Sequence, residues 1–261
     1  MLPIAVVAGL LIGLSLGALG GGGSILTVPA LVYLLHQAPH AAATGSLLIV
    51  GTTAVGGVVA HRRAGRVRLA PGIAFGVLGV AGSYAGTRLS VSIPSDLLLS
   101  LFAGLMLVAA AAMLRRRHAT AGPPGRASRP RGGTVAVRQA LKIVAAATGV
   151  GLLTGFFGVG GGFVIVPVLV LALGFDMPAA VGTSLLVIAI NSAAALAARL
   201  GSHASLDWPL LGVFTVAALA GVLVGNRVAS RVDAPRLTTA FAVLLITVAA
   251  YSLARSLPGL M

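Results

Sequence analysis

The chain has 261 residues, of which 58% are hydrophobic and 8% are charged, and its mean hydropathy is +1.07. This composition is typical of an integral membrane protein and excludes an ordinary soluble domain. The net charge of +14 would suit nucleic-acid binding, but no aromatic residue lies among the arginine clusters and no nucleic-acid motif is present. There is no cysteine, and the five histidines all fall near predicted loops. We therefore expect no disulfide, no metal site and no cofactor.

Apolar runs predict eight membrane spans, since a spanning helix needs roughly 20 mostly apolar residues. The predicted spans are 2–35, 41–60, 69–89 and 97–114 in the first half and 141–173, 178–198, 208–229 and 237–253 in the second. The first span of each half would reach roughly 50 Å as one helix, against a hydrocarbon core of about 30 Å. It must tilt, kink or divide, so whether it crosses the membrane once or twice stays open. The predicted fold class is an all-α integral membrane protein.

A glycine pattern occurs in both halves of the chain. A constant shift of 138 residues superposes Gly13 on Gly151, Gly20 on Gly158 and Pro29 on Pro167. We therefore divide the chain into a first transmembrane repeat (1–114), a basic linker rich in Pro, Gly and Arg (115–138) and a second transmembrane repeat (139–261). Each repeat has four helices, and the first is broken at a glycine cluster. Interrupted helices at matching positions of two repeats indicate a transporter's substrate site.

The arginines predict which side of the membrane each loop occupies. With a cytoplasmic N-terminus and eight crossings, the loop at 62–68 and the linker lie inside, and the outer loops carry few basic residues. Both termini are then cytoplasmic, and the two repeats share one orientation. If each glycine-broken segment crossed twice, five crossings per repeat would invert the second half.

The glycine clusters are the predicted substrate site. Adjacent glycines cost about 1 kcal/mol each relative to alanine inside a helix, and helix packing alone does not require so many. An unwound stretch exposes backbone N–H groups and a half-helix N-terminus, both of which attract anions. The more widely spaced ridge of Gly9, Gly13 and Gly17 is instead assigned to close helix packing.

Small polar side chains on the second element of each repeat supply neutral hydrogen bonds to the expected anion, although such groups singly tend to bond to their own helix. Two arginines at matching ends of the third elements either attract anions to a vestibule or extend to the membrane interface. The predicted substrate-binding residues are Gly20, Gly21, Gly22, Gly23, Ser24, Thr44, Ser46, Gly158, Gly160, Gly161, Gly162, Thr183, Ser184, Asn191, Arg88 and Arg227.

The glycine cluster with its proline, followed by Ala180-Val181-Gly182-Thr183-Ser184-Leu185, resembles the TauE/SafE family of sulfite and organosulfur exporters. The resemblance covers nearly the whole chain. The first repeat departs from it, with Ala43-Thr44-Gly45-Ser46 where the family favours Gly-Thr-Ser. The resemblance implies a secondary transporter that exports a small sulfur-containing anion, such as sulfite or sulfoacetate, across the bacterial cytoplasmic membrane. Its partners would be the anion and the lipid bilayer.

Other functions stay open at this point. One is an anion channel or uniporter, and another is a membrane scaffold that transports nothing, although a scaffold would not need the glycine breaks. A homo-oligomer is also open. We expect no enzyme activity, because a rhomboid-like protease would need Gly-x-Ser-Gly and a membrane histidine. There is no Walker loop, so ATP is not expected to drive transport.

Overall fold

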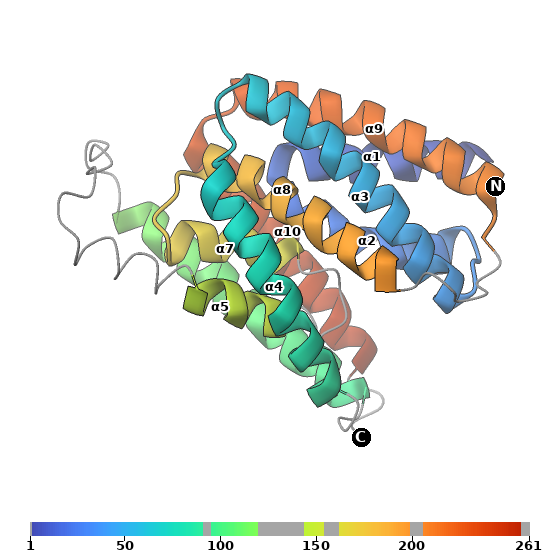
Figure 1. The fold of residues 1–261 in the computed structure, drawn as a ribbon, viewed down its shortest axis with the longest axis horizontal. Helices are drawn as coiled ribbons and strands as arrows, with labels where there is room; N and C mark the ends of the chain where they lie inside the picture. The colour runs from blue at the N-terminus through green and yellow to red at the C-terminus, as the bar shows by residue number, and fades with distance from the viewer. Residues whose placement is uncertain (1, 91–94, 120–143, 154–161, 199–205, 257–261) are drawn as a thin grey trace.

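The computed structural model describes residues 2–90, 95–119, 144–153, 162–198 and 206–256, and these residues form helices and no strand (Figure 1). The elements are α1 (Leu2–Leu19), the 3₁₀ turn η1 (Gly20–Gly23), α2 (Ser24–Pro29), the π-helical turn η2 (Ala30–Leu34), α3 (Pro39–Arg63), α4 (Leu69–Ser90), α5 (Ser95–Ala119), α7 (Gly162–Leu171), α8 (Met177–Ala198), α9 (Trp208–Arg231) and α10 (Ala234–Ser256). A further short helix covers Val144–Leu153.

Five helical segments in the described residues are long and apolar enough to cross a membrane. They are Leu2–Leu19, Thr44–Arg63, Met177–Ala197, Trp208–Arg231 and Ala234–Tyr251. Three shorter apolar helices cover Leu69–Tyr84, Ala103–Arg115 and Val144–Leu153. The prediction of a multi-pass helical membrane protein is thus confirmed, whereas the number of eight crossings stays a prediction.

The helices α1, α3 and α9 lie side by side and run in the same direction (Figure 1). Residues later in one helix contact residues later in the other, which shows that the helices of each pair are parallel. For α1 and α9 these contacts are Gly9 with Phe214 and Gly17 with Val222; for α3 and α9 they are Gly45 with Leu211 and Gly57 with Val222. Because α1 and α3 are parallel, the chain at 20–38 must return to the end of the bundle where α1 begins.

The reversal happens at the first glycine cluster. Gly20 has a φ of +68°, a left-handed conformation that glycine adopts without strain. Gly23 then packs against the backbone of Ile12 and Leu16 in α1. In a continuous helix, residues 12 and 23 would be about 16 Å apart along the axis. The broken segment therefore folds back on itself, and it does so where the glycines interrupt the helix, as predicted.

This return reverses one expectation about topology. The sequence analysis treats α3 and α8 as matching elements that run the same way with eight crossings, and it leaves open that a double crossing of each glycine-broken segment would invert the second half. The two helices run antiparallel, since Gly51 faces Ser192 and Gly57 faces Leu185. For the same reason, the beginning of α1 and the loop that follows Arg63 lie at opposite ends of the bundle. The physical cause is the additional passage of the chain after Gly20.

The α1–α9 interface is held together by bare backbone, as predicted for the glycine ridge. A Cβ at Gly13 would fall on the backbone of Ala218, and a Cβ at Gly221 would fall on the backbone of α1. Small residues let two helices approach this closely, and the gain is van der Waals contact. Gly151 approaches the backbone of Gly79 in α4 in the same manner.

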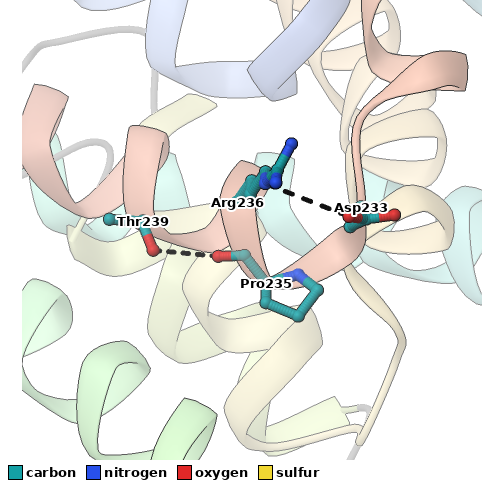
Figure 2. A network of polar contacts seen from close by, with 4 residues as sticks. All are labelled: Asp233, Pro235, Arg236 and Thr239. Atoms are coloured by element: carbon teal, nitrogen blue, oxygen red, sulfur yellow. Dashed lines mark hydrogen bonds and ion pairs between the residues drawn. The ribbon is translucent and has the colours of Figure 1, made fainter.

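The turn between α9 and α10 lies at the same end of the bundle as the end of α3, because α3 and α9 are parallel. Figure 2 shows how α10 begins there. Thr239 Oγ1 donates to the Pro235 carbonyl at 2.9 Å, and Arg236 lies 3.9 Å from Asp233. Both side chains of this ion pair are more than three-quarters exposed, so it contributes little to stability.

Candidate functional site

The two glycine clusters meet at one point of the fold. A Cβ on Gly21 of η1 would fall on the backbone of Gly162, the first residue of α7. A Cβ on Gly162 would in turn meet Gly21 and the Oγ of Ser24. Only residues without side chains allow this approach of two backbones. Of the other predicted glycines in the second cluster, Gly158, Gly160 and Gly161 lie outside the described residues.

Two serines border this meeting point. Ser24 Oγ donates to the Gly21 carbonyl at 2.7 Å, and Ser184 Oγ donates to the Val181 carbonyl at 2.8 Å. Both side chains are buried, and Ser184 Oγ lies directly beside Gly20. Each hydroxyl therefore bonds to its local backbone, which the sequence analysis weighed as the alternative for Ser184. A hydroxyl rotates readily, so both oxygens can also turn toward a ligand.

Thr27 of α2 is a buried polar residue that sequence reasoning did not select. Its Oγ1 has no hydrogen-bond partner within the described part of the chain, and its side chain is fully buried. Other helical threonines donate to the carbonyl four residues earlier, namely Thr52, Thr53, Thr215, Thr238, Thr239 and Thr247. The carbonyl at that distance from Thr27 belongs to Gly23, inside the 3₁₀ turn. The sequence signal was a hydroxyl in an apolar run, one turn after the glycine cluster.

Thr183 holds a loop against α8. Its buried Oγ1 accepts a hydrogen bond from the backbone N–H of Arg68 at 3.1 Å. The Arg68 guanidinium also lies 5.4 Å from the centre of the Phe175 ring, a distance at which a cation is attracted to an aromatic face. The loop between α3 and α4 is thereby fixed over the beginning of α8, next to Ser184.

The structure does not bring all predicted polar residues together. Thr44 and Ser46 are buried in the first turns of α3. Thr183 and Ser184 lie beside the opposite end of α3, where Gly182 contacts His61. Residues 46 and 61 are about 22 Å apart along the helix axis. The first-repeat hydroxyls are thus separated from the second-repeat hydroxyls, because α3 and α8 are antiparallel.

Asn191 and the two predicted arginines also occupy different places. Asn191 lies two turns beyond Ser184 in α8, near Gly79 of α4, and its Oδ1 is buried without a partner among the described residues. Arg227 is exposed near the end of α9. Arg88 lies near the end of α4. Because Gly72 meets Thr183 and Gly79 meets Asn191, α4 runs parallel to α8 and therefore antiparallel to α9. The two arginines therefore mark opposite ends of the bundle.

The sequence analysis placed His61 near a predicted loop and ended the span at residue 60. His61 lies in the last turn of α3, and its side chain is fully buried. Its Nε2 donates to the Gly17 carbonyl at 3.0 Å, while Nδ1 has no partner in the described structure. The following arginines made the region look like a loop, although the helix continues to Arg63.

The possible metal-binding side chains are dispersed over the described residues. No group of three or more His, Cys, Asp or Glu side chains comes together within them. The polar groups next to the glycine clusters are instead hydroxyls and backbone amides. Such groups bind a small anion or a neutral polar molecule by hydrogen bonds.

These features define a multi-pass helical membrane protein with a broken helix at its centre, and comparison with known proteins agrees. Residues 5–252 match the family described as Sulfite exporter TauE/SafE. A probable membrane transporter protein of Xylella fastidiosa strain Temecula1 is 33% identical over 98% of this chain and 96% of its own length. The probable membrane transporter protein YdhB of Bacillus subtilis is 30% identical over 83% and 86% of the two chains. No solved structure matches the chain significantly.

The chain therefore belongs to the TauE/SafE family of membrane transporters. The family resemblance seen in the glycine cluster and the Gly182-Thr183-Ser184 sequence is confirmed over nearly the whole length of the chain.

Proposed function

We propose that this chain is a secondary transporter that exports a small sulfur-containing anion, such as sulfite or sulfoacetate, across the bacterial cytoplasmic membrane. The observation that carries the proposal is the contact between Gly21 and Gly162, which brings the two glycine clusters together at one place. Backbone can be irregular at membrane depth only where protein buries it or where it lines a wet cavity. Exposed N–H groups at such breaks favour an anion without a buried charged side chain.

We further propose that the two repeats are inverted relative to one another. Contacts that recur at equivalent positions support this arrangement. In the first set, Gly13 meets Ala218 while Gly221 meets Leu10 and Leu14; in the second set, Gly151 meets Gly79 while Gly82 meets Thr148 and Leu152. Each residue of the second set is equivalent in sequence to one residue of the first set, with an offset of 138 or 139 positions. The antiparallel course of α3 and α8 favours an axis in the membrane plane, and such transporters bind their substrate at the repeat interface.

The same geometry leads us to propose that both termini face away from the cytoplasm. The end of the bundle at which α3 and α9 finish carries Arg62, Arg63, Arg66 and Arg68 in one connection and Arg227, Arg231 and Arg236 around the other. The positive-inside rule assigns this end to the cytoplasm. The N-terminus lies at the other end, and α10 is long enough to carry the C-terminus there as well.

A carrier is favoured over an open channel or an inert scaffold. The backbones of Gly21 and Gly162 leave no room for even one Cβ between them, so this state does not contain an open pore at that point. A scaffold would be more stable with alanines in place of adjacent helical glycines. We also propose that the chain is not an enzyme, since its family consists of transporters.

Flux of radiolabelled sulfite in liposomes containing the purified protein tests the proposal. The wild-type protein should give saturable flux. Gly21→Ala and Gly162→Ala should reduce the flux at least tenfold, because the added methyl group separates the two breaks.

Gly104→Ala in α5 is the matched control, since a Cβ there meets nothing within 4 Å. Saturable flux that is unchanged in Gly21→Ala and Gly162→Ala would contradict a site at the breaks. Flux that rises linearly with concentration would support a channel, and no flux of any sulfur oxyanion would overturn the assignment of substrate.

A further inference from the structure

We propose that His61 and Arg66 form a second anion site at the arginine-rich end of the bundle, and that this site selects an oxyanion that still carries a proton, such as hydrogen sulfite. The inference rests on the proposed function, because it describes a station on the path of the transported anion. Each of the two residues has a buried nitrogen without a hydrogen-bond partner among the described residues.

The two residues are held next to each other by the backbone. The N–H of Arg66 donates to the His61 carbonyl at 3.0 Å. Both residues also contact Gly182 of α8, where a Cβ would meet the Arg66 carbonyl and the Cβ of His61. The pair therefore lies where the end of α3 meets α8, and it contacts the residue that precedes Thr183.

His61 connects this place to the first helix break. Its Nε2–H donates to the carbonyl of Gly17, three residues before Gly20. Because that hydrogen bond fixes the proton on Nε2, the neutral imidazole leaves Nδ1 as a hydrogen-bond acceptor. This Nδ1 is buried and has no partner among the described residues.

Arg66 supplies a hydrogen-bond donor. Its Nη1 is also buried and unpartnered within the described part of the chain, and a guanidinium can only donate. One acceptor and one charged donor thus belong to two contacting residues, and neither has a partner among the described residues. Buried polar groups are almost always hydrogen-bonded in proteins, so two orphaned nitrogens in contacting residues call for an explanation by a ligand.

The complementary ligand has one negatively charged oxygen and one O–H group. The charged oxygen accepts from Arg66 Nη1, and the O–H donates to His61 Nδ1. A monoprotonated oxyanion has both groups. An alkyl sulfonate of the same charge has acceptor oxygens but no O–H donor, so it leaves His61 Nδ1 without a hydrogen bond. Leaving a buried acceptor unpaired gives strong discrimination against a ligand that lacks the matching donor.

The charged neighbours do not supply an alternative partner. On the connection itself, Arg62 and Arg63 are exposed, and Arg68 lies over Phe175. The contacts that α1 and α8 make with the pair involve Gly17 and Gly182, which carry no charge. Asp176, the residue immediately before α8, carries a carboxylate, and it is exposed. A carboxylate therefore does not neutralise Arg66 from any of these elements.

Nitrogen-15 NMR of histidine-labelled protein in detergent tests the site directly. Titration with hydrogen sulfite should move the His61 Nδ1 resonance, which is assigned by its loss in His61→Gln. Methanesulfonate at the same concentration should move it much less, because it has no proton to donate. Arg66→Gln should weaken the hydrogen sulfite response at least tenfold, a loss expected for one hydrogen bond to a charged ligand. Arg63→Gln, which removes an exposed charge from the same connection, should leave the response unchanged.

Sulfite flux in liposomes, measured on the same variants, separates this proposal from the proposed function. Flux in the wild type together with an unmoved His61 resonance would overturn the second site and leave the transporter assignment intact. A moved resonance without flux would support the site and overturn sulfite transport. An equal response to methanesulfonate would refute the proton-dependent selection. If Arg66→Gln fails to fold, Arg66→Lys preserves the charge and should retain a weakened response; an unchanged response in that variant would exclude a specific role for the guanidinium.

Discussion

Gly20 and Ser184 fit together because one of them has no side chain. A Cβ on Gly20 would lie 2.5 Å from the Oγ of Ser184, and the φ of +68° at Gly20 is disfavoured for any residue with a Cβ. The beginning of α8 therefore supports the reversal of the chain after α1. Two independent constraints, space and backbone conformation, act on the same position.

Gly20→Ala should lower the stability of the purified protein by more than the backbone conformation alone explains. Gly65 provides the control, since it has a φ of +69° and open space where a Cβ would be. Gly65→Ala should cost about 1–2 kcal/mol for the left-handed conformation. Gly20→Ala should cost clearly more in thermal unfolding in detergent. Equal losses in the two variants would mean that Ser184 does not constrain the turn.

Gly13→Ala should separate α1 from α9. The new methyl group would fall on the backbone of Ala218, which cannot move away as a flexible side chain could. We expect a loss of about 1–3 kcal/mol, typical of overpacking. Gly212→Ala in α9 meets nothing within 4 Å and should be neutral or stabilise the helix by up to about 1 kcal/mol. Unfolding in detergent measures both, and a stable Gly13→Ala protein would contradict a tight interface.

Thr27→Val should weaken anion binding without harming the fold. The substitution keeps the shape of the side chain and removes a buried hydroxyl that has no protein partner in the described structure. If that hydroxyl binds the substrate, affinity should fall roughly tenfold or more. Thr53→Val is the matched control, because the Thr53 hydroxyl is equally buried but bonds to the Ile49 carbonyl. Unchanged sulfite affinity in Thr27→Val, measured by calorimetry, would remove Thr27 from the site.

Labelling of single cysteines should place the N-terminus and the linker on opposite sides of the membrane. The natural chain has no cysteine, so each introduced thiol is unique. In intact cells, a membrane-impermeant maleimide should react with Leu2→Cys and with Asp207→Cys, and should fail to react with Ser128→Cys. After the cells are opened, Ser128→Cys should react. External labelling of Ser128→Cys with protection of Leu2→Cys would reverse the proposed orientation.

The sequence predicted the positions of the helices well and their directions poorly. The span predicted at 208–229 is the helix Trp208–Arg231, and the break predicted at Gly20 is present. Apolar length indicates that a segment lies in the membrane, but it carries no information about which way the chain runs. The reversal depends on the backbone angle of Gly20 and on the packing of Gly23 against α1, and neither can be read from composition. His61 was missed because its arginine neighbours suggested a loop.

The α1–α9 contact also has a consequence for how the chain is made. Gly13 and Ala218 are about 200 residues apart in the sequence. At the usual elongation rates of about 5–20 residues per second, the ribosome needs roughly 10–40 s to synthesise the partner of the first helix. Throughout that interval, the glycine-lined face of α1 has no α9 to pack against. Biogenesis must therefore keep the first helix in the membrane without its main partner, and the last fifth of the chain completes the assembly.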